Sequence, residues 1–232
     1  MTRTTVDDAR HRPLRGRSGV FAANPARAER WFFDAWSVFY DLPFVQRLTY
    51  RPVHEAILRV LHRHEPRELL DLGCGTGLLT PRICRAYPNA SVVGCDFSHG
   101  MLRRAAEHGH HGVWVQGDAT RLPFGDGRFD AIVSTEAFHW FPDQRAALDE
   151  CFRVLAPGGR LLVALVNPPV EAMSSAMYLG SRLVGQPFYW PTRERMRELV
   201  ESAGFRVEEQ QRLYRLPAGL LLPPVLTVAV RS

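Results

Sequence analysis

A short apolar segment that leads into a glycine loop constrains this chain more than any other feature. Residues 69–72 are apolar except for Asp71, and glycines follow at every second position: Gly73, Gly75 and Gly77. Such glycines let a tight turn bring backbone N–H groups close to a ligand, because no Cβ stands in the way. Residues 78–87 are helix-like, and the positive N-terminal end of a helix would lie nearby. The segment therefore predicts a nucleotide-type cofactor site at the first strand-to-helix turn of an α/β sheet.

The spacing of the glycines separates two classes of nucleotide cofactor. A dinucleotide fingerprint requires G-x-G-x-x-G. Here the glycines follow G-x-G-x-G, and Leu78 occupies the third dinucleotide position. This spacing counts against a nicotinamide-dependent oxidoreductase. That class of enzyme nevertheless stays open as an alternative function.

Further strands are predicted downstream, and two of them also end near an acid. Residues 91–96 are rich in β-branched side chains and end in Asp96, which is placed to accept hydrogen bonds from ribose hydroxyls. Residues 113–119 predict a third strand and a small-residue turn that contains Asp118. Residues 128–134 predict a fourth strand, and residues 153–161 predict a helix end, a turn and the start of a fifth strand. Three acids at successive strand ends, together with the glycine loop, favour a cofactor site over isolated solvated residues.

In order and spacing, these segments resemble the motif series of the class I S-adenosylmethionine-dependent methyltransferases. The resemblance covers roughly residues 69–166 and is closest to the branch that includes quinone-ring and other small-molecule methyltransferases. It implies an α/β fold, a Rossmann-like, seven-stranded, mostly parallel sheet with helices on both faces, an antiparallel C-terminal strand and an N-terminal helical cap. It also implies S-adenosyl-L-methionine as cofactor, S-adenosyl-L-homocysteine as its product, and methyl transfer to a small, lipophilic or aromatic acceptor, with O- or C-methylation favoured.

The resemblance also assigns cofactor contacts by position. Asp71 and the glycine loop would hold the methionine end, Asp96 the ribose, and Asp118 with Ala119 the adenine. Tyr40 matches a tyrosine of an N-terminal helix that caps the cofactor in this branch. The full expected set is Tyr40, Asp71, Gly73, Cys74, Gly75, Thr76, Gly77, Asp96, Phe97, Met101, Gly117, Asp118, Ala119, Ser134 and Thr135.

The loop after the fourth predicted strand holds the candidate catalytic residues. Methyl transfer needs a general base only if the acceptor must lose a proton. His139 is the first candidate because imidazole titrates near neutral pH, and Glu136 is the second. The alternative is that His139 packs or hydrogen-bonds behind the cofactor.

Aromatic side chains are dense near both predicted site loops. They suit a pocket for a flat or lipophilic acceptor, but ordinary core packing explains an aromatic stripe equally well. The residues concerned are Trp31, Trp36, Tyr40, Phe44, Trp140, Tyr189 and Trp190. No metal is expected, and His108, His110 and His111 are interpreted as solvated loop histidines because no suitably spaced carboxylate or cysteine accompanies them.

Composition excludes several classes of function. The 232 residues contain no lysine, so every basic side chain is arginine. Schiff-base chemistry and P-loop nucleotide hydrolysis both need a lysine amine. No apolar run is long enough for a membrane span, no signal-peptide core is present, and the four cysteines form no C-x-x-C pair. We therefore expect a cytoplasmic protein with reduced thiols, as monomer or homodimer.

Charge and composition suggest how the chain is organised. The first thirty residues contain seven arginines and three acids, which accounts for +4 of the net charge of +5. We interpret residues 1–24 as a flexible arm that could make weak contact with a membrane surface, and residues 25–232 as one methyltransferase domain. Within it, residues 25–50 form the helical cap and residues 167–190 an insertion near the acceptor site. The nearly neutral body argues against a nucleic-acid substrate.

Residues outside the motif series supply the remaining expected elements. Residues 52–64 and 192–203 predict helices, the second one capped by Thr192. Residues 205–216 and 224–231 predict the last two strands. Two functional alternatives stay open: a cofactor-binding protein without turnover, and a protein or nucleic-acid methyltransferase.

Overall fold

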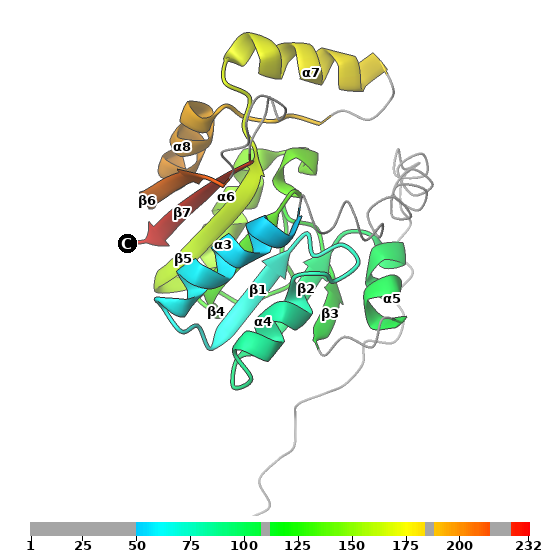
Figure 1. Ribbon diagram of the computed structural model, residues 1–232, viewed down its shortest axis with the longest axis vertical. Helices are drawn as coiled ribbons and strands as arrows, with labels where there is room; N and C mark the ends of the chain where they lie inside the picture. The colour runs from blue at the N-terminus through cyan, green and yellow to red at the C-terminus, as the bar shows by residue number, and fades with distance from the viewer. Residues whose placement is uncertain (1–49, 108–111, 184–187, 214–223) are drawn as a thin grey trace, which may run out of the picture.

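A computed structural model describes residues 50–107, 112–183, 188–213 and 224–232 of the chain (Figure 1). The predicted arm, nearly all of the predicted cap, Tyr40 and the three loop histidines lie outside these residues. The described part contains one sheet with helices on both of its faces.

The sheet has seven strands in the order β3-β2-β1-β4-β5-β7-β6. The first five in this order run parallel to one another, and β7 is antiparallel to both β5 and β6. This topology confirms the predicted Rossmann-like, mostly parallel sheet. The strands are β1 (Glu68–Leu72), β2 (Ser91–Asp96), β3 (Val113–Gln116), β4 (Phe129–Thr135), β5 (Leu155–Val166), β6 (Phe205–Arg212) and β7 (Pro224–Arg231).

The helices are amphipathic and bury their apolar sides against the sheet. One core cluster joins α3 and α4 to one sheet face, and another joins α6 and α8 to the opposite face, while α5 packs on β2 and β3 (Figure 1). The described helices are α3 (Arg51–His62), α4 (Thr80–Ala86), α5 (His99–Glu107), the short 3-10 helix η2 (Phe138–Trp140), α6 (Gln144–Val154), α7 (Glu171–Leu183) and α8 (Arg193–Ser202).

Side-chain alternation along β1 decides where its acid points. Leu70 and Leu72 belong to the core cluster that includes α6 and α8, whereas Leu69 belongs to the cluster that includes α3 and α4. Because successive side chains of a strand point to opposite faces, Asp71 shares the face of Leu69. The acid therefore lies under the start of α4, where Thr80 is found.

Local signals set both ends of α8 as expected. The side chain of Thr192 accepts a hydrogen bond from the Arg195 backbone N–H at 3.1 Å, and Gly204 just beyond α8 has φ +95°. These features confirm the predicted cap and stop of that helix.

The expected turn before the fifth strand is instead an irregularity inside β5. Phe129 pairs with Leu155 but Ala131 pairs with Arg160, so β5 carries extra residues opposite β4. Gly158, with φ +78°, supplies the left-handed position that this bulge requires. Strand pairing across the bulge extends β5 back to the end of α6, which a local turn signal does not indicate.

The carboxyl ends of the parallel strands lie along one edge of the sheet. In the register, Asp71 stands beside Gly94 on one side and Val133 on the other, and Asp96 pairs with Gln116. The loops that follow β1, β2, β3 and β4 therefore meet at this edge, where open α/β sheets bind ligands. The first turn of α3 lies at the same edge, and α7 stands beyond it (Figure 1).

Candidate functional site

The glycine loop after β1 is left-handed at all three glycines. The φ angles are +71° at Gly73, +54° at Gly75 and +77° at Gly77. A Cβ on Gly73 would lie 2.3 Å from the Cβ of Ala137, and one on Gly77 would lie 2.6 Å from the Trp114 ring. A Cβ on Gly75 would meet no atom of the described residues within 4 Å. Two glycines are thus required for packing, and the middle one faces open space in which a ligand would fit.

Backbone hydrogen bonds tie this loop to the end of β2. The N–H groups of Gly73 and Cys74 both donate to the Cys95 carbonyl, at 2.8 and 3.2 Å. Cys74 and Thr76 are buried, so their side chains support the loop. These contacts hold the loop in place within the fold.

Asp71 is a buried carboxylate with one free oxygen. Its Oδ2 accepts a hydrogen bond from the Thr80 hydroxyl at 2.6 Å. Its Oδ1 is also buried and has no hydrogen-bond partner among the described residues. Burial raises the pKa of Asp71 to about 7, the Thr80 bond opposes the shift, and the negative charge of Asp96 adds to it. A cationic group at this position would satisfy the free oxygen and restore the charged form.

Asp96 at the end of β2 links two loops. Its Oδ2 accepts from the Gly75 N–H at 2.9 Å, and its Oδ1 accepts from the Ser98 N–H at 2.8 Å. Burial raises the pKa of this carboxyl, although both backbone bonds oppose the rise. Because each carboxylate oxygen has two lone-pair sites, both can accept a further hydrogen bond from a ligand hydroxyl.

The loop after β3 packs tightly behind Asp96. The Gly117 N–H donates to the Asp96 carbonyl at 3.1 Å, and a Cβ on Gly117 would lie 2.8 Å from the Cys95 sulfur. Asp118 is exposed, and its Oδ1 accepts from the backbone N–H and the hydroxyl of Thr120, both at 2.8 Å. Asp118, the residue predicted to contact adenine, therefore lies at the edge of the sheet. Hydrogen bonds within its own turn fix its side chain. Ala119 beside it is buried.

Two further predicted cofactor residues flank the start of α5. Phe97 is 58% exposed, and its carbonyl accepts from the Gln116 side chain at 3.0 Å. Met101 is half-buried, and its N–H donates to the Ser98 hydroxyl at 3.3 Å. Both residues follow Asp96 closely, so they lie beside it at the sheet edge rather than in the core.

The loop after β4 contains a strained, half-buried acid. Glu136 has φ +49°, a conformation that costs a non-glycine residue about 1–3 kcal/mol. Its N–H donates to the Ala164 carbonyl at 2.8 Å. Burial raises the pKa of its carboxyl to about 7, opposed by a hydrogen bond from the Val166 backbone N–H. Thr135 before it is half-buried, and the Ser134 hydroxyl is buried without a partner in the part of the chain that the structure describes.

His139 is enclosed by aromatic rings. Its ring centroid lies 4.8 Å from that of Trp190, 5.1 Å from that of Trp140 and 6.1 Å from that of Phe188. Its Nδ1 finds no partner within the described ranges, and burial lowers the pKa of the ring to about 3. The imidazole is therefore neutral at pH 7 and binds a proton weakly.

The structure thus brings most predicted cofactor residues to one edge, and the contact between Gly73 and Ala137 joins the glycine loop to the loop that carries Glu136. Sequence reasoning missed Thr80 and Gly94. A Cβ on Gly94 would lie 2.5 Å from the Trp114 ring. A glycine inside a strand is the signal that could have revealed this close approach.

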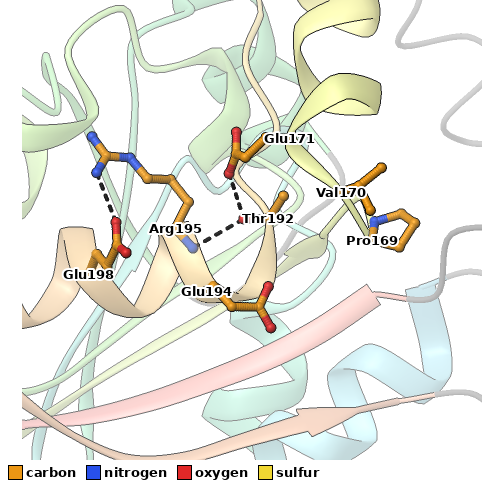
Figure 2. Close-up of a pocket in the computed structure, with 7 residues that line it drawn as sticks. All are labelled: Pro169, Val170, Glu171, Thr192, Glu194, Arg195 and Glu198. Carbon is orange, nitrogen blue, oxygen red and sulfur yellow. Dashed lines mark hydrogen bonds and ion pairs between the residues drawn. The ribbon is translucent and has the colours of Figure 1, made fainter.

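A separate hollow of about 470 Å³ lies between α7 and α8 (Figure 2). The Thr192 hydroxyl donates to Glu171 at 2.7 Å, and Arg195 pairs with Glu198 at 3.0 Å. Most of its polar groups are thereby paired with one another, so the cluster fastens α7 to the start of α8. Its lining residues are Pro169, Val170, Glu171, Thr192, Glu194, Arg195 and Glu198, and they include none of the predicted cofactor residues.

No group of three or more metal-ligating side chains comes together within the described residues. In the same part of the chain, no helix is long and apolar enough to cross a membrane. All four cysteines are free thiols.

Comparison with known proteins agrees with this geometry. A family model described as a methyltransferase domain matches residues 70–163. A demethylmenaquinone methyltransferase from Corynebacterium kroppenstedtii is 33% identical over 159 residues, 60% of this chain and 68% of that protein. A malonyl-(acyl-carrier protein) O-methyltransferase from Hahella chejuensis is 32% identical over 188 residues, 78% of this chain and 65% of that protein.

A solved methyltransferase from Thermotoga maritima shares the fold, with a TM-score of 0.68 at 22% identity, over 89% of this chain and 100% of that one. The chain spans between 53% and 65% of the length of the first curated relatives that it matches. The family match, the extended similarity and the seven-stranded sheet with its glycine loop together show that this chain belongs to the class I S-adenosylmethionine-dependent methyltransferases.

Proposed function

We propose that this chain transfers the methyl group of S-adenosylmethionine to a small, lipophilic or aromatic acceptor. The observation that carries the proposal is the open position at Gly75, in the loop that follows Asp71, where the Gly75 N–H donates to the Asp96 carboxylate. The cofactor supplies a methyl group on a cationic sulfur. The donor would leave as a neutral thioether once the acceptor has taken the methyl group, and any proton that the acceptor loses would pass to a base of the protein or to water.

The residues of the edge suit the parts of this cofactor. In our proposal Asp71 and the glycine loop hold the methionine end, where the free Oδ1 of Asp71 would accept from the ammonium group. The oxygens of Asp96 retain capacity for the ribose hydroxyls, and Asp118 with Ala119 would bind the adenine. Two carboxylates with raised pKa values favour a ligand that brings positive charge.

Glu136 and His139 are the proposed candidates for the base. A carboxyl with a pKa of about 7 is matched to proton transfer near neutral pH, whereas an imidazole with a pKa of about 3 is a weaker proton acceptor. The aromatic surroundings of His139 support the alternative role, in which it packs against the acceptor or behind the cofactor.

The acceptor class is inferred from the aromatic residues and from the relatives. Trp140, Phe188 and Trp190 are half-buried and would present flat apolar surface to an acceptor. One relative is named for a quinone precursor and the other for an acyl-carrier conjugate, which supports C- or O-methylation of a small group. We also propose a cytoplasmic location, which the four free thiols support, and a monomer or homodimer without nucleic-acid partners.

The test uses cofactor labelled on its methyl group, incubated with the protein and a soluble and lipid extract of the source cells. Label is followed separately into lipid, polar small-molecule, protein and nucleic-acid fractions. We expect label in a small-molecule or lipid fraction, and less of it with the Asp96→Ala variant. Label only in protein or nucleic acid would favour the macromolecular alternative. Cofactor binding without label in any fraction, also with purified quinone and acyl-carrier acceptors, would favour a binding protein without turnover.

A further inference from the structure

Three buried polar atoms without partners lie in one small region at the carboxyl edge of the sheet. They are the Nδ1 of His139 in η2, the Oδ1 of Asn167 directly after β5 and the Nε1 of Trp190. His139 is 4% exposed and Asn167 is 6% exposed. Within the part of the chain that the structure describes, none of the three atoms has a hydrogen-bond partner. Buried polar groups are nearly always paired, so three unpaired ones in one region require an explanation.

Contacts between neighbouring segments show that the three side chains lie together. The ring centroids of His139 and Trp190 are 4.8 Å apart. The Asn167 side-chain nitrogen donates to the carbonyl of Pro191, the residue after Trp190, at 2.7 Å. The Tyr189 N–H donates to the His139 carbonyl at 3.0 Å. The loop after β4, the residue after β5 and the segment before α8 therefore meet at these side chains.

The orientation of the Asn167 amide leaves its oxygen unpaired. A backbone carbonyl only accepts hydrogen bonds, so the amide nitrogen must face Pro191 and the oxygen must face elsewhere. The nearest backbone supplies few donors, because Pro168 and Pro169 follow Asn167 and neither they nor Pro191 carry an N–H. The oxygen is thus available to a group from outside this backbone.

The three atoms offer complementary hydrogen-bonding groups to a ligand. The Trp190 indole N–H only donates, the Asn167 oxygen only accepts, and the His139 Nδ1 does one or the other according to its tautomer. A hydroxyl or a primary amide both donates and accepts, so one such group matches the set. An anion fits poorly, because the Glu136 carboxyl, with a pKa of about 7, accepts from the Val166 N–H directly before Asn167.

We propose that His139, Asn167 and Trp190 form a subsite for a neutral hydroxyl or primary amide group of the acceptor. The inference rests on the proposed methyl transfer and deepens it, since the acceptor would carry this polar group beside its flat apolar part. Trp190 is half-buried whereas the other two residues are buried, so the group would reach the subsite past the Trp190 ring. An acceptor without the group would leave buried polar atoms unpaired and would be rejected.

The test is a titration of the full chain, labelled with ¹⁵N in its tryptophan indoles, followed by NMR of the indole N–H signals. The probes are para-cresol, para-methylanisole, para-xylene and para-toluate, which differ only in a hydroxyl, methoxy, methyl or carboxylate substituent. Trp190→Phe assigns the Trp190 signal and removes the donor while keeping a flat ring. Asn167→Leu removes the acceptor at similar size. Trp114→Phe, the matched control, makes the same change at a half-buried indole of β3.

We expect para-cresol to bind at least about tenfold more tightly than para-xylene or para-toluate. It should also move the Trp190 signal downfield, as a new hydrogen bond from that N–H does. Para-methylanisole accepts but does not donate, so its affinity should lie between those of para-cresol and para-xylene. Trp190→Phe and Asn167→Leu should abolish the preference for para-cresol and keep the affinity for para-xylene, whereas Trp114→Phe should keep both.

The proposal is overturned if para-xylene or para-toluate moves the Trp190 signal as far as para-cresol does, or if Trp190→Phe keeps the preference. A Trp190 signal that no probe moves also overturns it, as expected if a bound water or another part of the chain pairs these atoms. If Asn167→Leu loses para-xylene as well, that variant has disturbed the site and Trp190→Phe alone decides. These titrations need neither cofactor nor turnover, so they can fail while the labelling experiment succeeds, and the reverse.

Discussion

Three carboxyl groups at the carboxyl edge of the sheet share a raised pKa. Asp71 lies in β1, Asp96 ends β2 and Glu136 follows β4, and in each case burial is the largest cause of the shift. Shifted pKa values that gather at one edge are typical of functional sites, because ligands or protons are exchanged there. Each carboxyl has hydrogen-bond partners of its own, so the three can be tested one at a time.

Asp96→Ala should weaken binding of S-adenosylhomocysteine by about 1.5–3 kcal/mol, the usual loss for a hydrogen bond to a charged group. The variant removes the proposed ribose acceptor and also the bond that holds the Gly75 N–H. Calorimetric titration measures the loss. Asp149→Ala, which breaks only an exposed ion pair with Arg145, is the control. Equal affinity in the two variants would refute the role of Asp96.

The ligand-free protein should lose stability as pH rises toward neutrality. Burial raises the pKa of Asp71 from 3.8 to about 7, so the folded state holds a proton that the unfolded state has already released. The stabilisation is complete below the unfolded value, declines as pH rises through the folded value, and is absent above it. At about 1.4 kcal/mol per unit of pKa difference, the loss is a few kcal/mol at most.

Urea unfolding between about pH 4 and pH 8 measures this slope. Asp71→Asn should flatten it, since the amide oxygen can still accept from Thr80 and nothing titrates. Asp96 and Glu136, whose pKa values are also raised, account for a remainder with the same sign. An exposed control, Glu107→Gln, should leave the slope unchanged. Identical slopes for Asp71→Asn and the wild type would contradict the assignment.

If Glu136 is the base, methyl transfer to an acceptor that loses a proton should accelerate as pH rises through about 7. Glu136→Gln should then lower kcat on the order of 10²–10⁴-fold, with little change in cofactor affinity. His139→Gln provides the comparison, because a ring with a pKa of about 3 is neutral throughout this range. If only His139→Gln lost turnover, and the rate of methyl transfer did not rise with pH near 7, His139 would be the general base instead.

At the scale of elements, the glycine loop combines two functions in three residues. Gly73 and Gly77 let the loop approach Ala137 and Trp114, and Gly75 leaves space open. Gly73 and Gly77 serve packing between elements, whereas Gly75, in our proposal, leaves room for the cofactor. The same chemical change should therefore have different consequences at neighbouring positions of one loop.

Gly73→Ala should destabilise the fold by about 2–4 kcal/mol, because it adds a left-handed strain to a clash with Ala137. Gly75→Ala carries the strain alone and should cost about 1–2 kcal/mol. Its Cβ would enter the open space, so its affinity for S-adenosylhomocysteine should fall by at least about tenfold. Urea unfolding and titration separate the two effects. The reverse order of destabilisation would show that Gly75 is the packed position.

At the scale of the molecule, the sheet places loops from distant parts of the sequence along one edge. The parallel order β3-β2-β1-β4-β5 directs the loops after β1, β2, β3 and β4 to the same edge. A ligand that spans these loops binds only the folded chain, so binding is linked to global stability. Ligand specificity can thus be measured without knowing the acceptor.

S-adenosylhomocysteine at about one hundred times its Kd should stabilise the fold by about 2.7 kcal/mol. NADH at the same concentration should give no shift, because the loop lacks the third dinucleotide glycine. Thermal unfolding with each ligand makes the comparison. Stabilisation by NADH alone would restore the oxidoreductase alternative.

The sequence by itself determined the order of strands and helices, the glycine loop and the acids at the strand ends. These features are local: alternation, capping and glycine spacing act within a few residues. For this reason the sequence predicts the succession of β1, with its Asp71, and the glycine loop. It also predicts the capped helix α8.

Only the tertiary structure decided the environments of the side chains. The pairing of Asp71 with Thr80, the left-handed conformation of Glu136 and the enclosure of His139 by Phe188 and Trp190 depend on packing between distant segments. Burial and partners set the pKa values, so the character of a carboxyl or an imidazole follows from its neighbours in space. A sequence pattern places a residue at the site, and the fold decides which chemistry it can perform.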